Sequence, residues 1–285
     1  MTTIIANKYE ILSKIGEGSF GKVFKGKHIL TGEEFAIKIQ HKDIEHVLKH
    51  EAKIYKYLHG INGVPLIRNY GTDSGFNYLI LDYINISLDK TILTHENITK
   101  YFINAINIIE NIHNKGVLHR DIKPDNFMLK ENNGTTKLYI IDFGLAKIFL
   151  SDDKKHIEER NDKKLVGTVK YASINLHNGI EASRRDDIES LCYTFISLYK
   201  KSLLWDDDIE EYYKKSIDKR ENISYLHNKI LEKKQNYFEW LYDIPGEFLT
   251  ILLYSRSLKF PEKPNYKYLR GILENLLEHQ LKTHI

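Results

Sequence analysis

The pattern of apolar residues changes about a third of the way along this 285-residue chain. Before Ile84, short runs of β-branched and aromatic residues lie between glycines and polar residues, which is typical of strands joined by tight turns. The expected strands are 9–15, 23–28, 34–39, 66–70 and 78–82. One amphipathic helix over 44–58 interrupts them and carries Glu51 on its inward stripe. This part is expected to form a sheet with one helix.

After Ile84, apolar residues recur at steps of three and four. This period predicts helices over 98–114, 186–199, 223–234, 245–257 and 266–279, with a strand over 138–141. The two patterns predict an α+β chain with a small β-rich N-lobe (1–84), which holds one main helix, and a larger, mostly α-helical C-lobe (85–285). Together the lobes would make one catalytic domain over 9–280.

A glycine-rich string, Gly16-Glu-Gly18-Ser-Phe-Gly21-Lys-Val23, lies between the first two expected strands. This spacing also opens dinucleotide-binding folds and arises by chance. A dinucleotide site requires a helix directly after the glycines, whereas Val23 continues as a strand. A strand-turn-strand of this kind can lie over a triphosphate, because glycines let backbone amides approach its oxygens.

Lys38 ends an apolar run, Ala36-Ile37-Lys38, in the third expected strand. A lone lysine in a strand is usually a solvated edge charge. Here Glu51 lies on the inward stripe of the next helix, so an ion pair can form. Such a pair would hold the Lys38 ammonium where it can bind α- and β-phosphates.

The most specific string is His119-Arg-Asp121-Ile-Lys123-Pro-Asp-Asn126. Phosphoryl transfer requires orientation, metal ions and neutralised charge. Asp121 can orient a hydroxyl and accept its proton, Lys123 can reach the γ-phosphate, and Asn126 offers an oxygen to Mg²⁺. Asp142, in Asp-Phe-Gly after the strand over 138–141, suits a metal that bridges β- and γ-phosphates. Because these residues occur together in this order, a catalytic role is favoured over the alternative that each lies in an isolated, solvated turn.

The composition indicates which partners and which cellular compartment to expect. The net charge of +3 gives no reason to expect nucleic acid as a partner, and no window approaches the ~20 apolar residues of a membrane span. A single cysteine, Cys192, excludes an internal disulfide and fits a reducing compartment. We therefore expect a cytoplasmic or nuclear protein, monomeric, that binds neither nucleic acid nor membrane.

Together these motifs resemble the signature set of eukaryotic protein kinases. The resemblance implies the two-lobed protein kinase fold, ATP and Mg²⁺ as cofactors, and protein substrates with Ser or Thr acceptors. It implies that Lys38 and Glu51 position the nucleotide and that Asp121 is the catalytic base beside Lys123. Asn126 and Asp142 would bind metal. Thr168 matches the threonine that contacts the base and the loop lysine in serine/threonine kinases.

The same resemblance implies a set of nucleotide-binding residues drawn from the glycine loop, the lysine strand, the segment between the lobes and two later positions. They are Ile15, Gly16, Glu17, Gly18, Ser19, Phe20, Gly21, Val23, Ala36, Lys38, Leu81, Asp82, Ile84, Leu129 and Ile141.

Further strings are similar to casein kinase I. Where most kinases have Ala-Pro-Glu, this chain reads Ser173-Ile-Asn175, followed by Ser183-Arg-Arg-Asp-Asp187. Arg256-Ser-Leu258 and Lys263-Pro264 extend the likeness, which covers about residues 9–280. Vaccinia-related kinases share the Ser-Arg-Arg string but differ in the catalytic loop, and they are the alternative.

This resemblance implies a preference for Ser or Thr preceded by acidic or phosphorylated residues. Lys163 and Lys170 match the positions associated with anion binding, and Arg160, Lys147 and Lys164 lie nearby in the sequence. Such a cluster often only solvates a loop, but the match favours a substrate anion site. The acidic run 206–211 that follows Trp205 would repel a phosphorylated substrate.

Between Asp142 and Gly167 the chain has Ser151 but no threonine or tyrosine. We therefore expect constitutive activity, without phosphorylation of this segment. A nucleotide-binding pseudokinase scaffold is the alternative from another class of protein. It is disfavoured because Lys38, Asp121 and Asn126 are all present together with Asp142.

Overall fold

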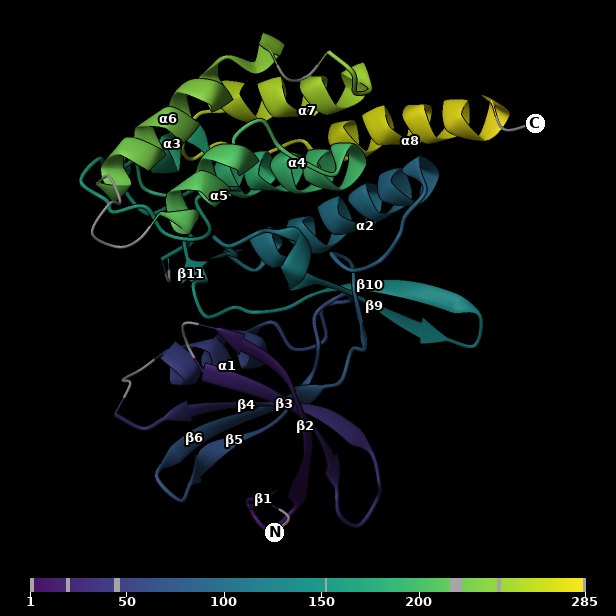
Figure 1. The fold of residues 1–285 in the computed structure, drawn as a ribbon, viewed down its shortest axis with the longest axis vertical. Coiled ribbons are helices and arrows are strands. Elements are labelled where there is room, and N and C mark those ends of the chain that lie inside the picture. Colours follow the sequence, from purple (N-terminus) through teal and green to yellow (C-terminus); the bar gives the residue numbers. More distant parts are fainter. Residues whose placement is uncertain are drawn as a thin grey trace. The chain divides into compact units, whose positions relative to one another are not determined.

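The computed structural model describes residues 3–18, 21–43, 47–151, 153–215, 222–239 and 242–283. The chain packs as two units (Figure 1). The first comprises Met1–Leu88 and Phe127–Ala146, and the second comprises Asp89–Asn126 and Lys147–Ile285. The division into lobes at residues 84 and 85 stays a prediction.

The first unit is built on a six-stranded antiparallel sheet with the strand order β1-β2-β3-β4-β6-β5. All five strands expected from the sequence are confirmed, and a short β1 is added. Their bounds are β1 (Ile4–Ile5), β2 (Tyr9–Gly18), β3 (Gly21–His28), β4 (Glu34–His41), β5 (Ile67–Asp73) and β6 (Phe76–Asp82).

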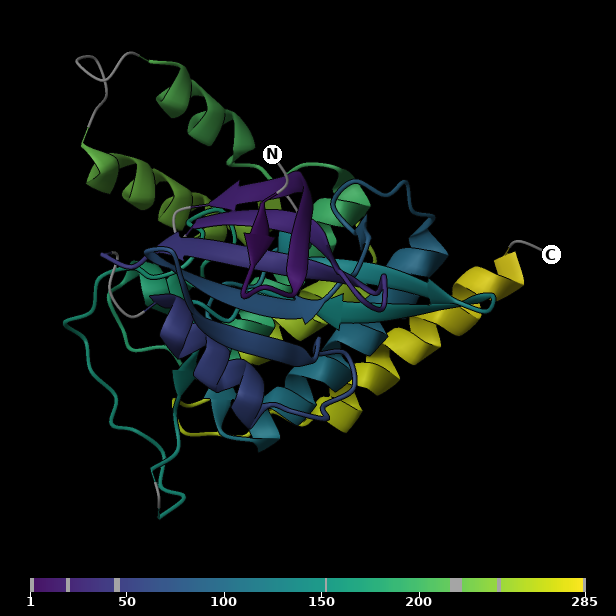
Figure 2. The same ribbon diagram turned by 90° about the horizontal axis from the view of Figure 1, so that it is seen from below.

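One face of this sheet carries an apolar core, and the other face carries Lys38. Ile37 and its neighbours form an apolar core on one face, in which Tyr9 and Phe35 make an edge-to-face contact at 5.7 Å. Side chains alternate along a strand, so Lys38 points to the opposite face. There α1 (Val47–Tyr57) packs against β5 and β6 (Figures 1 and 2). This confirms the single predicted helix, although residues 44–46 of its expected range lie outside the described residues.

A second, three-stranded sheet completes the first unit. Its order is β10-β9-β7, with β7 (Ile86–Ser87), β9 (Phe127–Asn132) and β10 (Thr135–Ile140). Only β10 was expected. The β9–β10 hairpin delivers Asp142 two residues after β10 ends, as the sequence pattern predicts.

The second unit is mostly helical. Its elements are α2 (His95–Asn114), β8 (Val117–Leu118), β11 (Lys147–Ile148), α3 (Ile174–His177), α4 (Arg184–Lys200), α5 (Asp206–Lys214), α6 (Ile223–Gln235), α7 (Gly246–Ser257) and α8 (Tyr266–Thr283). All five predicted helices are confirmed, and so is the fold class. The sequence did not predict α5, whose three aspartates fill its first turn and stabilise the positive end of the helix dipole.

Helix α4 is the centre of the second unit. It packs against α2 and α7, and every residue from Asp186 to Leu198 is buried. Phe102 of α2 stacks on Phe195 at 4.5 Å. Three carboxylates, those of Asp186, Asp187 and Glu189, are buried with the apolar residues. No helix within the described ranges has both the length and the apolar character to cross a bilayer.

Gly26 tests the packing of the first sheet. A Cβ on Gly26 would lie 2.3 Å from Ile37 Cδ1 and 2.7 Å from the Glu10 carbonyl oxygen. We therefore expect Gly26→Ala to lower the free energy of unfolding by about 1–3 kcal/mol, measured by urea titration. Gly18→Ala in the same hairpin is the control, because its Cβ would meet nothing within 4 Å. Equal losses in both variants would contradict this packing.

Candidate active site

A lysine–carboxylate cluster lies on the α1 face of the first sheet. Lys38 Nζ lies 2.7 Å from Glu51 Oε2 and 3.1 Å from Asp142 Oδ1. Glu51 is 1% exposed, as its place on the inward stripe predicts. The structure therefore brings together, within one unit, Lys38 from a strand, Glu51 from a helix and Asp142 from the Asp-Phe-Gly string.

The positive charge of Lys38 lies next to the carboxylates of Glu51 and Asp142. Burial alone would favour a neutral lysine, but the carboxylates of Glu51 and Asp142 outweigh it and raise the pKa of Lys38. Burial raises the pKa of Glu51 to about 7, against the opposing Lys38 ammonium. Lys38 therefore keeps its proton and can act as a fixed positive charge.

Tyr55 orients Asp142, a role that sequence reasoning missed. The backbone N–H of Asp142 donates to the Tyr55 hydroxyl at 3.1 Å, and the Tyr55 ring meets buried Phe143 edge-on at 5.0 Å. Asp142 has a φ of +65°, which is unusual for an aspartate. Tyr55 is buried on the inward side of α1, and nothing in the sequence pattern revealed its hydroxyl partner.

The glycine string forms a hairpin between β2 and β3. Gly16 pairs with Val23, and Gly18 pairs with Gly21. Ser19 and Phe20, both predicted to bind nucleotide, lie outside the described residues. The pairing confirms the two strands expected on either side of this string, and a strand follows the glycines where a dinucleotide site needs a helix.

The other predicted nucleotide-binding residues of the first unit lie on neighbouring strands or beside them. Ala36 is opposite Leu81 in the β4–β6 register, and Leu129 lies in β9. Leu81, Ile84 and Leu129 are buried, whereas Ile15 is exposed. Their role in binding a nucleotide stays a prediction.

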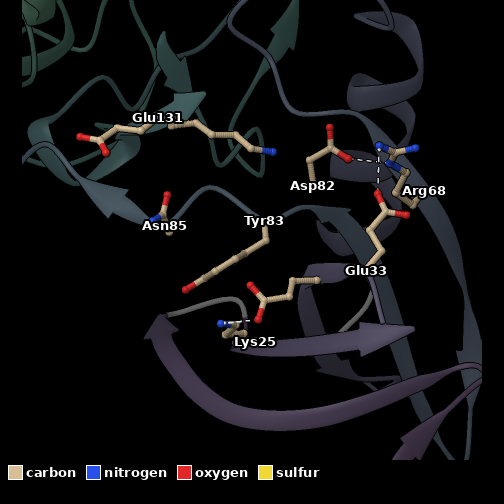
Figure 3. Close-up of a pocket in the computed structure, with 9 residues that line it drawn as sticks. Lys25, Glu33, Arg68, Asp82, Tyr83, Asn85 and Glu131 are labelled. Atoms are coloured by element: carbon tan, nitrogen blue, oxygen red, sulfur yellow. Dashed lines mark hydrogen bonds and ion pairs between the residues drawn. The ribbon is translucent and has the colours of Figure 1, made fainter. Parts of the chain in front are cut away.

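A polar pocket of about 650 Å³ also lies in the first unit (Figure 3). Of the predicted nucleotide-binding residues it includes Asp82 alone. Its lining carries charges of both signs, among which Lys25 pairs with Glu34 and Arg68 pairs with Asp82. Asp82 therefore lines a charged pocket, whereas a nucleoside base binds against apolar surfaces.

A second cluster, around Asp121, lies in the second unit. Asp121 Oδ1 accepts hydrogen bonds from the backbone N–H of Thr168 at 2.9 Å and from its hydroxyl at 2.7 Å. Asp121 Oδ2 lies 2.9 Å from Lys123 Nζ, which also donates to the Thr168 hydroxyl at 3.1 Å. Asn126 Nδ2 donates to the Asp121 carbonyl at 2.8 Å. The structure thus unites Asp121, Lys123, Asn126 and Thr168.

Gly167 permits the approach of Thr168 to Asp121. Its φ is +92°, and a Cβ there would lie 2.4 Å from the Arg120 carbonyl oxygen. Any other residue would push the segment that carries Thr168 away from the loop over 119–126, which we call the catalytic loop after its predicted role.

Asp187 of α4 fixes the backbone of the loop that precedes Asp121. Its carboxylate accepts from the backbone N–H groups of His119, at 2.8 Å, and Arg120, at 2.9 Å, and lies 2.9 Å from His113 Nε2. Burial would raise the pKa of Asp187, but His113 and the backbone donor of His119 outweigh it and lower the pKa. The sequence showed the Asp-Asp string but not this task.

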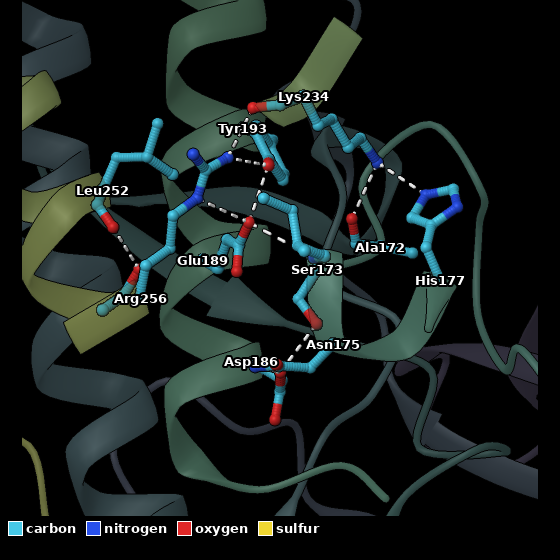
Figure 4. Close-up of polar contacts among 12 residues, drawn as sticks. Ala172, Ser173, Asn175, His177, Asp186, Glu189, Tyr193, Lys234, Leu252 and Arg256 are labelled. Atoms are coloured by element: carbon cyan, nitrogen blue, oxygen red, sulfur yellow. Dashed lines mark hydrogen bonds and ion pairs between the residues drawn. The ribbon is translucent and has the colours of Figure 1, made fainter. Parts of the chain in front are cut away.

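The segment after Thr168 is also held by α4 (Figure 4). Asp186 Oδ1 accepts from the Ser173 hydroxyl at 2.6 Å and from Asn175 Nδ2 at 3.0 Å. Glu189 Oε1 accepts from the Ile174 backbone N–H at 3.3 Å. The Ser-Ile-Asn string that departs from Ala-Pro-Glu is therefore bonded to two buried carboxylates.

Lys234 of α6 supports the same segment from the other direction (Figure 4). Its side chain is fully buried and donates to the carbonyl oxygens of Val169, at 2.9 Å, and Ala172, at 2.7 Å. Arg256 bridges Glu189, at 3.1 Å, and the Lys234 carbonyl, at 2.9 Å. These contacts leave the segment little freedom to move away from Asp121.

Each predicted anion-site residue pairs with a carboxylate of the second unit. Lys170 Nζ lies 2.7 Å from Asp206 Oδ2, Lys163 Nζ lies 3.5 Å from Glu181 Oε2, and Arg160 lies 2.6 Å from Asp162. A substrate anion would have to compete with these partners. Its binding at these residues stays a prediction.

The donor atoms suit Mg²⁺. Asp142 offers a carboxylate, and the bond from Asn126 Nδ2 to Asp121 turns the amide oxygen of Asn126 away from that contact. These are the hard oxygen ligands that Mg²⁺ takes. No group of three or more His, Cys, Asp or Glu side chains in the described part of the chain forms a metal cage.

The family model described as protein kinase domain matches residues 9–281, which is nearly the whole chain. The match includes both clusters, the glycine hairpin and the Ser-Ile-Asn segment.

Tyr55 supplies a stability test of the first cluster. Tyr55→Phe removes the hydroxyl to which the half-buried N–H of Asp142 donates, so we expect the free energy of unfolding to fall by about 0.5–1.5 kcal/mol in urea titrations. Tyr57→Phe on the same helix is the control, because Tyr57 is exposed and should show no change. If both variants had the same free energy of unfolding as the parent protein, the Tyr55 hydroxyl would contribute nothing to stability.

Proposed function

The chain belongs to the protein kinase family, and on that premise we propose that it is a serine/threonine kinase of casein kinase I type, transferring the γ-phosphate of ATP to protein hydroxyls. One observation carries this proposal. The Asp121 carboxylate contacts both Thr168 and Lys123, which also contact each other. The proposed base, a cation and a hydroxyl therefore lie within hydrogen-bonding distance of one another. In this family a threonine at that place accompanies Ser and Thr acceptors, and the Ser-Ile-Asn segment supports the casein kinase I type.

The proposed chemistry assigns a task to each residue. Asp121 orients the substrate hydroxyl and takes its proton as the oxygen attacks the γ-phosphorus. The bond between that phosphorus and the β-phosphate oxygen breaks, and ADP leaves. Lys123 neutralises charge on the transferred group, while Lys38, held by Glu51, binds phosphate oxygens. Mg²⁺, bound through Asp142 and Asn126, would neutralise charge on the phosphates.

Asp121→Asn tests the proposed activity. It removes the base while keeping the shape of the side chain, so we expect transfer of radiolabel from ATP to a Ser peptide to fall about 10²- to 10⁴-fold. Asp125→Asn is the matched control, because its carboxylate is exposed in the same loop and should leave the rate unchanged. Background incorporation by the unsubstituted protein would favour a scaffold that binds nucleotide without transfer.

We also propose that Lys170 contacts an acidic or phosphorylated residue of the substrate in competition with Asp206. The resemblance to casein kinase I supports the contact, and the 2.7 Å ion pair supports the competition. Lys170 follows Thr168 by two residues, which places it near the base along the chain. Asp206 would then weaken the preference for phosphorylated substrates.

Asp206→Asn should therefore strengthen that preference. The ion pair is partly exposed, so we expect the ratio of kcat/KM for a phosphoserine-primed peptide over its unprimed match to rise about two- to fivefold. Asp207→Asn removes the same charge from the same helix at an exposed position and serves as the control. A ratio that rose equally in both variants would indicate a general charge effect and refute competition at Lys170.

A further inference from the structure

Glu181 is a buried carboxylate to which the proposed chemistry gives no task. It is 4% exposed, and its Oε2 lies 2.9 Å from Lys147 Nζ and 3.5 Å from Lys163 Nζ. Lys147 lies in β11, and Lys163 lies in the segment that leads to Thr168. One carboxylate therefore joins two stretches of chain that both follow the loop over 119–126 in sequence.

The charge of a third basic residue, Arg120, also acts on this carboxylate. Burial lowers the pKa of the Arg120 guanidinium, and the charges of Glu181 and Asp187 oppose that effect. Burial would raise the pKa of Glu181, but Lys147, Lys163 and Arg120 outweigh it and lower the pKa, so Glu181 is ionised. Arg120 directly precedes Asp121, the proposed base.

The backbone reinforces the same connection. The Glu181 N–H donates to the Arg160 carbonyl at 2.7 Å, and the Lys163 N–H donates to the Gly179 carbonyl at 2.9 Å. Residues 160–163 are thereby held beside residues 179–181. Glu181 thus lies where its charge and its backbone fix the same stretch of chain.

Three cations from separate segments around one buried anion are also what a phosphorylated activation segment creates in kinases that need that modification. There a phosphate orders the segment through new contacts with basic side chains. In this chain the residues from Asp142 to Gly167 offer Ser151 as the sole hydroxyl. The carboxylate of Glu181 already supplies an anion to the basic side chains.

We propose that Glu181 is a positioning residue that takes the place of an activation-segment phosphate, holding Arg120, Lys147 and Lys163 so that Asp121 and Thr168 stay in contact without modification. This rests on the proposed kinase function and adds the regulation of that site. Loss of the carboxylate would leave three cations near one another without their shared anion, and the segment would move away from the loop.

Charge and shape can be separated at this position. Glu181→Gln keeps the shape and removes the charge, so we expect kcat for a Ser peptide to fall about two- to thirtyfold. Glu181→Asp keeps the charge and should retain most of the parent kcat. Glu158→Gln, at an exposed glutamate of the same segment, is the control and should leave kcat unchanged. Equal losses for Gln and Asp at position 181 would show that shape alone matters and would overturn the proposal.

Chemical rescue supplies a readout that a merely structural role would not move. Acetate has the carboxylate that Glu181→Ala lacks, so added sodium acetate should raise the kcat of this variant severalfold, whereas sodium chloride at equal ionic strength should not. If Glu181→Ala does not fold, the comparison of Glu181→Gln with Glu181→Asp decides in its place. A folded variant that acetate leaves unchanged would contradict the proposal.

The unmodified protein completes the test. Phosphatase treatment of the unsubstituted kinase, checked by intact mass, should leave its kcat unchanged, and so should Ser151→Ala. A loss of activity after either change would overturn the role of Glu181 while leaving the kinase function intact. If the unsubstituted protein transferred no phosphate at all, the proposed function itself would fail.

Discussion

The buried carboxylates of α4 are the constraint on which the second unit depends. Asp186, Asp187 and Glu189 are almost fully shielded from water, where an unpaired charge would cost several kcal/mol. Their hydrogen-bond donors come from the loop that carries Asp121 and from the Ser-Ile-Asn segment. Satisfying the charges of the helix therefore fixes the positions of the proposed base and of the segment after Thr168. Stability and site geometry arise from the same contacts.

In both units, lysines near the proposed site are paired with carboxylates. Lys38 lies between two carboxylates in the first unit, and Lys123, Lys163 and Lys170 each lie against a carboxylate in the second. These pairs hold long side chains in defined places before any substrate arrives, which lowers the entropy lost when a phosphate binds. They also mean that a phosphate must compete for its cations, so the neighbouring carboxylates set how strongly it is preferred.

Local periodicity predicted most of the fold, because strands and helices bury their apolar residues at periods of two and 3.6. It also placed Glu51 on the inward side of α1, and the joint motifs identified the residues that gather around Asp121. It could not predict the Tyr55 hydroxyl contact or the hold of Asp187 on the catalytic loop, since both join residues far apart in sequence. The acidic run after Trp205 suggested repulsion of a substrate, whereas the structure shows a direct pair and a helix, α5.

The proposed reaction is transfer of phosphate from ATP to aliphatic hydroxyls of proteins. The most direct measurement incubates the full chain with γ-labelled ATP, Mg²⁺ and an equal mixture of peptides that differ only in a Ser, Thr or Tyr acceptor. The labelled phosphoamino acids are then separated. We expect label on phosphoserine and phosphothreonine and none on phosphotyrosine. Label confined to phosphotyrosine, or none on any acceptor, would contradict it.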